Sequence, residues 1–313
     1  MTPNDRIPRL DRDRLYLADG GLETTMMYRE GIELPEFAAF VLLNDQRRRE
    51  ALRRYYCSYI QIARQHGLAF TLDTPTWRAN PDWGEKLGYS RPRLAEVNRA
   101  AVGFADGIRA EHEAPRTPIA VCGTIGPRGD GYHPAGVMSA QEADAYHAWQ
   151  IAIFRDVGTD MVSAFTLTYA DEAIGIVRAA ATLRVPVSIS FTVETDGRLP
   201  SGQSLGEAIE QVDAATDGAS AYFMINCAHP VHFADELERG GAWMARLGGI
   251  RANASTKSHA ELDQSPTLDS GDPTDLGAQY KRIKPRTASV RVIGGCCGTD
   301  TRHITSICEN WLH

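Results

Sequence analysis

Three cysteines are the residues of this chain best suited to metal chemistry. Cys296 and Cys297 are neighbours between paired glycines, directly after the largely apolar run 290–293, and Cys227 follows a second apolar run, 221–225. A disulfide between adjacent cysteines is strained, so a soft metal ion explains the pair better. Three thiolates with one open position are typical of a catalytic zinc site, because a structural site is closed by four protein ligands. A structural zinc site and inert buried thiols are the alternatives.

Short apolar segments alternate along the chain with longer amphipathic ones, of which 140–157 and 170–183 have helical spacing. This alternation favours parallel strands joined by right-handed crossovers. Eight such units predict a single (β/α)8 TIM barrel over residues 1–313. An open doubly wound sheet is the alternative, but no Gly-x-Gly-x-x-Gly motif follows the first strand. The expected strands are Leu15–Ala18, Ala69–Asp73, Pro118–Cys122, Met161–Phe165, Pro186–Phe191, Ala221–Ile225, Gly248–Ala252 and Val290–Ile293.

The predicted barrel gathers the candidate chemistry at one end. Active sites of such barrels lie at the carboxyl ends of the strands. Asp19 follows the first predicted strand, Cys227 the sixth, and the two adjacent cysteines the eighth. Because the first and eighth strands are neighbours in a closed barrel, these residues can converge although they are far apart in sequence. Two long segments, 78–93 and 255–273, are expected to be loops.

Composition and charge limit the possible partners. The 313 residues are 43% hydrophobic and 23% charged, which is enough for a sizeable core. A net charge of −7 argues against nucleic acid or an anionic membrane as a partner. No apolar stretch reaches the ~18 residues that a membrane span needs, and the N-terminus lacks a hydrophobic signal region. The six cysteines are too sparse for a disulfide scaffold, so we expect a cytoplasmic protein with reduced thiols.

Short motifs spread over nearly the whole chain resemble those of a known protein family. They are Asp19-Gly20-Gly21 with Thr24, Gly126-Pro127-x-Gly129, Ser190-Phe191-Thr192, Asp196-Gly197, Ser201-Gly202, Asn226-Cys227, Ala252-Asn253-Ala254 and Gly294-Gly295-Cys296-Cys297-Gly298-Thr299. With these motifs the chain resembles the zinc-dependent homocysteine S-methyltransferase family, which includes the betaine–homocysteine and S-methylmethionine–homocysteine methyltransferases. The combination of Asn-Cys with Gly-Gly-Cys-Cys-Gly is the most specific part of the resemblance.

The resemblance implies a (β/α)8 barrel with Zn²⁺ as cofactor and assigns roles to several residues. The zinc ligands match the three cysteines. An aspartate that binds the substrate amino group matches Asp19, and the backbone amides of Gly20 and Gly21 would receive the substrate carboxylate. The alternatives are a loop cap for Asp19 and a plain tight turn for the glycines. Asn226 and Asn253 are expected to orient ligands or brace loops around the metal.

The chain departs from the family pattern in the expected amino-acid pocket. Where the family has a glutamate that helps to hold the amino group of homocysteine, this chain has Phe165. Glu23 and Glu194 are candidates to compensate, with Glu23 favoured because it is close to Asp19; local hydrogen bonding is the alternative for both. Trp77 is the preferred wall for a cationic methyl donor, because cations are attracted to the faces of aromatic rings.

Together these observations predict a zinc-dependent S-methyltransferase. It would move a methyl group from an onium donor, of the S-methylmethionine, S-adenosylmethionine or betaine type, to the thiolate of homocysteine and give methionine. Because of Phe165, a different small thiol is the alternative acceptor. A non-catalytic zinc- or thiol-binding protein is a further alternative. The expected partners are these small molecules, and the sequence leaves open whether the protein is a homo-oligomer.

Overall fold

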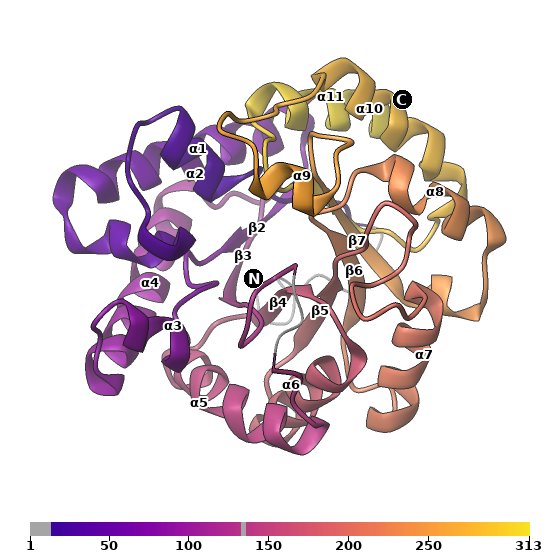
Figure 1. Ribbon diagram of the computed structural model, residues 1–313. Helices are drawn as coiled ribbons and strands as arrows, with labels where there is room; N and C mark the ends of the chain where they lie inside the picture. Colours follow the sequence, from indigo (N-terminus) through magenta and orange to yellow (C-terminus); the bar gives the residue numbers. More distant parts are fainter. Residues whose placement is uncertain (1–13, 133–135) are drawn as a thin grey trace.

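Eight parallel strands close into a barrel in chain order in the computed structural model, which describes residues 14–132 and 136–313 (Figure 1). β1 closes the barrel by pairing with β8, with Tyr16 opposite Val292. The predicted TIM barrel is therefore confirmed. The strands are β1 Tyr16–Leu17, β2 Ala69–Asp73, β3 Ile119–Ile125, β4 Met161–Leu167, β5 Val187–Phe191, β6 Tyr222–Asn226, β7 Leu247–Ala252 and β8 Val292–Gly295.

Helices surround the barrel in Figure 1, and both helices predicted by range have the expected bounds. Polar caps set several helix starts: the side chain of Ser139 accepts from the amide of Glu142, and Ser204 does the same with Glu207. The α-helices are α1 Leu22–Tyr28, α2 Gln46–His66, α3 Pro81–Lys86, α4 Arg91–His112, α5 Ala140–Val157, α6 Ala170–Leu183, α7 Leu205–Thr216, α8 Pro230–Arg239, α9 His259–Asp263, α10 Pro273–Ile283 and α11 Thr301–Leu312. The 3₁₀ helices are η2 Pro35–Phe37, η3 Ala39–Asn44, η4 Ala242–Arg246 and η5 Lys284–Arg286.

The strands are buried on both faces, because side chains alternate between the barrel interior and the helical layer. Leu17 and Ile293 belong to the large core cluster, while their neighbours Tyr16 and Val292 belong to a second, smaller cluster. The smaller cluster also contains Phe165. Continuous burial explains why these strands appear in the sequence as apolar runs.

Two segments that we expected to be loops contain helices, so that part of the prediction is wrong. In 78–93, Asn80 accepts a hydrogen bond from the amide of Trp83 at 3.2 Å, and Pro81 begins α3. In 255–273, Ser258 and Glu261 form a capping box that begins α9. Both starts follow from local chemistry, a capping side chain followed by proline or by glutamate three residues later.

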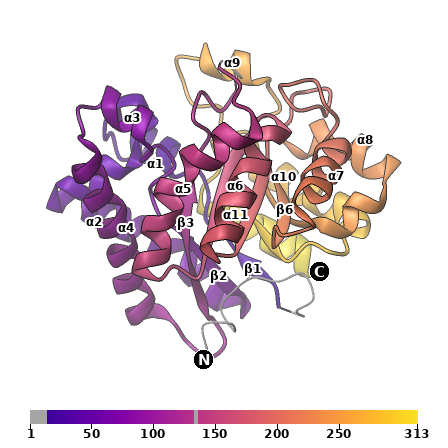
Figure 2. The ribbon, with the colours of Figure 1, turned by 90° about the horizontal axis from the view of Figure 1, so that it is seen from below.

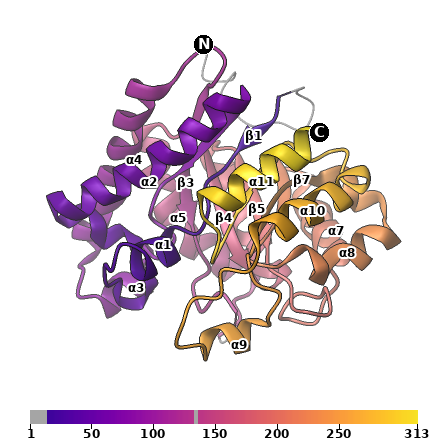
Figure 3. The same ribbon diagram turned by 90° about the horizontal axis from the view of Figure 1, so that it is seen from above.

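The loops after β2 and β7 gather at one end of the barrel. Side views from opposite directions place α3 and α9 toward this end and the C-terminus of the chain toward the other (Figures 2 and 3). The site residues that follow β1, β6 and β8 therefore face a rim partly covered by α9. Within the described residues, no helix has the length and apolar character to cross a membrane.

Candidate metal and substrate site

The three cysteines predicted to act together meet at the carboxyl ends of β6 and β8. The amide of Cys227 donates to the carbonyl of Arg251 at 3.1 Å, and the amide of Cys296 donates to the carbonyl of Ala252 at 2.8 Å. Both cysteine loops are thus held against the end of β7, which lies between β6 and β8. The sulfur atoms of Cys227, Cys296 and Cys297 all lie within 4.8 Å of one another. Such a group of soft donors could hold a metal ion.

Two of these sulfurs are bonded to each other in the structure. A disulfide joins Cys227 and Cys296, whose Cα atoms are 5.3 Å apart, and Cys297 is free with its Sγ 4.0 Å from that of Cys227. From the sequence we expected three thiolates. A disulfide sulfur carries no negative charge, so all three become thiolate ligands only when this bond is reduced.

The glycines after β1 allow this loop to pack closely against the cysteine loop. A Cβ on Gly20 would lie 2.9 Å from the carbonyl oxygen of Thr299, and one on Gly21 would lie 2.8 Å from that of Cys296. The amide of Gly21 donates to the carbonyl of Thr299 at 3.1 Å, and Thr24 Oγ1 accepts from the amide of Gly298 at 3.1 Å. Close backbone contact therefore requires glycine here.

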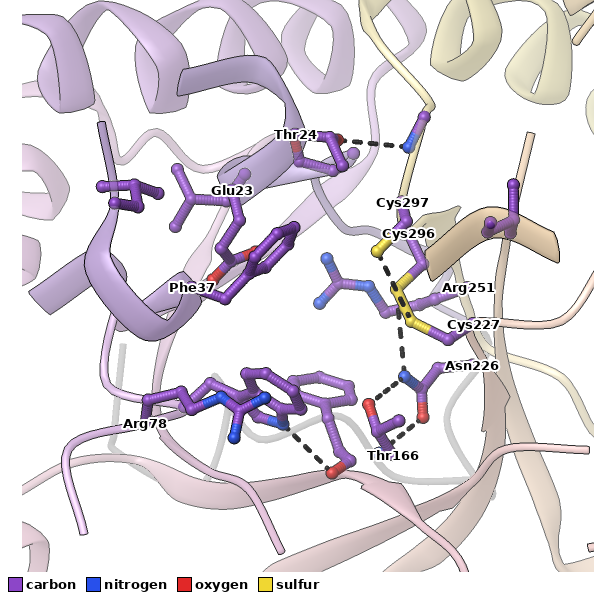
Figure 4. A pocket seen from close by; sticks show the side chains of 18 of the residues that line it. Glu23, Thr24, Phe37, Arg78, Thr166, Asn226, Cys227, Arg251, Cys296 and Cys297 are labelled. Atoms are coloured by element: carbon purple, nitrogen blue, oxygen red, sulfur yellow. Dashed lines mark hydrogen bonds between the residues drawn. A yellow bond between two sulfur atoms is a disulfide. The ribbon is translucent and has the colours of Figure 1, made fainter. Parts of the chain in front are cut away.

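Asn226 braces the end of β4 beside the cysteines. Its Oδ1 accepts from the amide of Thr166 at 2.9 Å and from Ser190 Oγ at 2.6 Å, while its Nδ2 donates to Thr166 Oγ1 at 2.9 Å. The same Nδ2 lies 3.9 Å from Cys296 Sγ (Figure 4). Thr166 has a φ of 62°, so these bonds hold a backbone conformation that side chains disfavour. Asn253 is buried behind the rim, and its backbone amide donates to Ala228.

Asp19 is paired with an arginine of the chain itself. Nη2 of Arg251 bonds to Asp19 Oδ1, its Nη1 donates to Asp73 Oδ2 at 2.6 Å, and its Nε donates to the carbonyl of Gly295 at 3.2 Å. The guanidinium carbon lies 4.9 Å from the centre of the Phe165 ring. We did not predict Arg251 from the sequence; an arginine inside the predicted buried strand 248–252 is the signal that could have indicated it.

This buried cluster of charges has perturbed pKa values. Burial raises the pKa of Asp73 to about 6 and also raises that of Asp19, although the charge of Arg251 opposes both shifts. Burial by itself lowers the pKa of Arg251, but the two carboxylates outweigh it and raise that pKa. The guanidinium therefore stays charged, and it holds both carboxylates in place.

Of the two glutamates proposed to compensate for Phe165, Glu23 lies in the cavity beside the cysteines. Burial raises the pKa of Glu23 to about 7, and the negative charge of Asp19 adds to this effect. Glu194 instead lies 3.2 Å from Nδ1 of His259, whose Nε2 is 2.7 Å from the carbonyl oxygen of Cys227. Glu23 is thus the carboxylate in reach of a ligand, and Glu194 is part of a contact between α9 and the Cys227 loop.

Aromatic side chains form the remaining walls. Trp77 donates from Nε1 to the carbonyl of Phe165 at 3.3 Å, and the guanidinium carbon of Arg78 lies 4.6 Å and 3.5 Å from the ring centres of Trp77 and Trp83. The hydroxyl of Tyr132 lies 3.9 Å from Cys297 Sγ. Trp77 lines the cavity with Arg78 packed over its indole ring, and its role as a wall for a cationic donor stays a prediction.

These groups enclose a cavity of about 610 Å³. Figure 4 shows Glu23 and Phe37 on one side, the cysteines on the other, and the guanidinium of Arg251 pointing into the space between them. Of the predicted site residues, the cavity wall includes Asp19, Gly20, Gly21, Glu23, Trp77, Phe165, Asn226, Cys227, Cys296 and Cys297, and Asn253 is not part of it.

The chain is similar over nearly its whole length to proteins of one known family. Residues 16–311 match the family model described as homocysteine S-methyltransferase. Betaine–homocysteine S-methyltransferase 1 of Rattus norvegicus is 25% identical over 331 residues, covering 97% of this chain and 74% of the rat protein.

Solved structures of similar fold come from Escherichia coli. The oxidized form of its homocysteine methyltransferase MmuM superposes with a TM-score of 0.75 at 20% identity, covering 98% of this chain and 99% of that one. The metallated form gives 0.71 at 19% identity, with 96% of each chain covered. Since the family model spans almost all of the described barrel, this chain belongs to the homocysteine S-methyltransferase family.

Proposed function

We propose that this protein is a zinc-dependent S-methyltransferase that moves a methyl group from an onium donor to a small thiol, with homocysteine as the family's reference acceptor. The observation that carries the proposal is the meeting of three cysteine sulfurs within 4.8 Å at the wall of a cavity, in a chain of this family. After reduction, this all-sulfur donor set fits zinc and leaves a fourth position open.

Zinc held by Cys227, Cys296 and Cys297 would supply the positive charge that keeps an acceptor thiol deprotonated near neutral pH. The thiol proton leaves to solvent. The thiolate sulfur then forms a bond to the methyl carbon while the bond from that carbon to the sulfonium sulfur or ammonium nitrogen breaks. The donor departs as a neutral thioether or tertiary amine, so one negative and one positive charge disappear together.

The chain's own residues favour such a cationic donor. Glu23 lines the cavity, and burial raises its pKa to about 7, so its carboxyl group ionises in the neutral pH range. A carboxylate in a partly buried cavity attracts an onium group more strongly than one in bulk water. Asn226 and the contacts at the end of β7 hold the cysteine loops in place, which limits the movement of the sulfurs.

The test is methyl transfer by the reduced, zinc-loaded protein. S-methylmethionine, S-adenosylmethionine and glycine betaine are offered in turn with homocysteine or 4-mercaptobutanoate, and the S-methylated products are detected by mass spectrometry. Cys297→Ala should lose both zinc and product, whereas Cys57→Ala, a change on α2, should keep both. Product formation that survives Cys297→Ala would contradict the proposal, and so would full zinc loading of the wild type without turnover on any pair.

A further inference from the structure

Arg251 contacts both positions that the family pattern assigns to the substrate amino group. In the family pattern, the amino group of homocysteine is held by an aspartate that matches Asp19 and by a glutamate at the position of Phe165. In this structure the guanidinium of Arg251 lies between these two residues, bonded to Asp19 and 4.9 Å from the centre of the Phe165 ring. A positive group of the protein thus lies beside both positions that the family pattern assigns to the substrate's positive group.

We propose that the methyl acceptor of this protein is a small thiol that lacks an α-ammonium group, such as a mercaptocarboxylate, and that Arg251 determines this choice. The inference rests on the proposed S-methyltransferase function and narrows its acceptor. It depends on residues of β2, β4 and β7 and on Asp19 after β1, none of which is a predicted metal ligand.

Of the two carboxylates that hold an ammonium group in the family pattern, one is replaced here and the other is shared with Arg251. Asp19 Oδ1 already accepts from Arg251, and a phenylalanine ring offers no carboxylate oxygen in place of the glutamate. An ammonium brought to this place would also lie beside a guanidinium that cannot lose its proton in a protein. The guanidinium repels such an ammonium, while Asp19 and Asp73, which accept its hydrogen bonds, offset part of its charge.

Arg251 is fixed in this position rather than free to swing away. Its side chain is buried and makes three polar contacts, to Asp19, to Asp73 at 2.6 Å and to the carbonyl of Gly295 at 3.2 Å. Moving it would leave two buried carboxylates without their counter-charge, which is costly. Arg251 is therefore a fixed part of the cavity wall that a ligand contacts.

The test compares two thiols that differ only in the ammonium group, homocysteine and 4-mercaptobutanoate. The reduced wild-type protein is loaded with Co²⁺, and each thiol is titrated without a methyl donor while the sulfur-to-cobalt absorption band is followed. We expect 4-mercaptobutanoate to bind at least about tenfold more tightly than homocysteine. We also expect kcat/KM of the zinc enzyme to be higher for 4-mercaptobutanoate than for homocysteine. Equal or tighter binding of homocysteine would overturn the inference and leave the proposed function intact. A cobalt spectrum that responds to neither thiol would overturn both.

A variant tests the assignment to Arg251. Arg251→Met alone would leave two unpaired buried carboxylates, so Asp73→Asn is added to remove one of them. Phe165→Glu is included for a different reason, to restore the glutamate of the family pattern, and folding is checked by circular dichroism. The preference should move toward homocysteine by at least about tenfold. Arg246→Met with Asp213→Asn removes another arginine–aspartate pair, 2.7 Å apart and outside the cavity wall, and should leave the preference unchanged. A folded triple variant that keeps the wild-type preference would contradict the role of Arg251; the wild-type titration decides the acceptor class whether or not the variant folds.

Discussion

Replacing Glu23 with glutamine should make the protein more stable above neutral pH and leave it almost unchanged in mild acid. Glu23 is partly exposed to the cavity, and burial, aided by the charge of Asp19, raises its pKa from the ordinary 4.5 to about 7. The folded protein therefore binds the carboxyl proton more tightly than the unfolded chain does. Stability that depends on this group is highest below the unfolded pKa and falls as the pH rises toward 7.

The size of the effect follows from this difference in pKa. At ~1.4 kcal/mol for each pKa unit, the ionised carboxylate costs the folded state at most ~3.4 kcal/mol at pH 8. Because the side chain is partly exposed, water screens the charge and we expect about 1–2 kcal/mol. The neutral amide of Glu23→Gln removes this cost. The variant should therefore exceed the wild type in free energy of unfolding by about 1–2 kcal/mol at pH 8 and by well under 1 kcal/mol at pH 5.

Urea denaturation of both proteins at a series of pH values measures this difference directly. Other titrating groups change both curves alike, so the difference between the two proteins isolates Glu23. Glu33→Gln removes an exposed carboxylate from the same region and serves as the control for loss of one charge. A stability difference for Glu23→Gln that does not change between pH 5 and pH 8, or a loss of stability at pH 8, would refute the reasoning.

Three further outcomes follow from the site. Zinc bound per chain, measured by atomic absorption, should rise to one only after reductant treatment, because the disulfide removes two of the three ligands; equal loading without reductant would contradict this. Asn226→Ala should lower the free energy of unfolding by about 2–3 kcal/mol in urea titrations, because three buried hydrogen bonds are lost; a loss below about 0.5 kcal/mol would contradict the bracing role. Gly294→Ala should lower the free energy of unfolding by about 1–3 kcal/mol, because the new Cβ would lie 2.8 Å from the Cβ of Ala18. Gly103→Ala is the control: its Cβ would meet no atom within 4 Å, so the free energy of unfolding should stay the same or rise.

The sequence predicted the barrel because its signal is local and repeated. Each strand appears as a short apolar run, and α5 and α6 have the helical spacing and the bounds that were expected. Closing eight such units then places the residues after β1, β6 and β8 on one rim, so the meeting of Cys227 with Cys296 and Cys297 could be predicted from their positions after strands. The need for glycine at Gly20 and Gly21, by contrast, comes from close contact with the distant cysteine loop.

Other features of the site depend on contacts between distant parts of the chain. β4 continues through Thr166 to Leu167, two residues beyond the expected end, with Asn226 of β6 bonded to Thr166. The disulfide between Cys227 and Cys296 likewise requires the distance between two loops rather than any local pattern. The spacing of the apolar segments in the sequence predicts neither the extension of β4 nor this disulfide.

Arg251 is the clearest example of what only the tertiary structure decided. Its sequence position, inside a buried strand, already indicated that the guanidinium needs a partner, but not which one. Asp73 is 178 residues away and Asp19 is 232 residues away, and both come within bonding distance because β7 and the ends of β1 and β2 point into the same barrel mouth. The role of a charged residue cannot be assigned until its neighbours are known. Burial and counter-charges determine whether it repels a ligand, binds a ligand or only stabilises the fold. The meeting of the three cysteines could be predicted from the sequence, whereas the electrostatic character of the pocket beside them was set by the closing of the barrel.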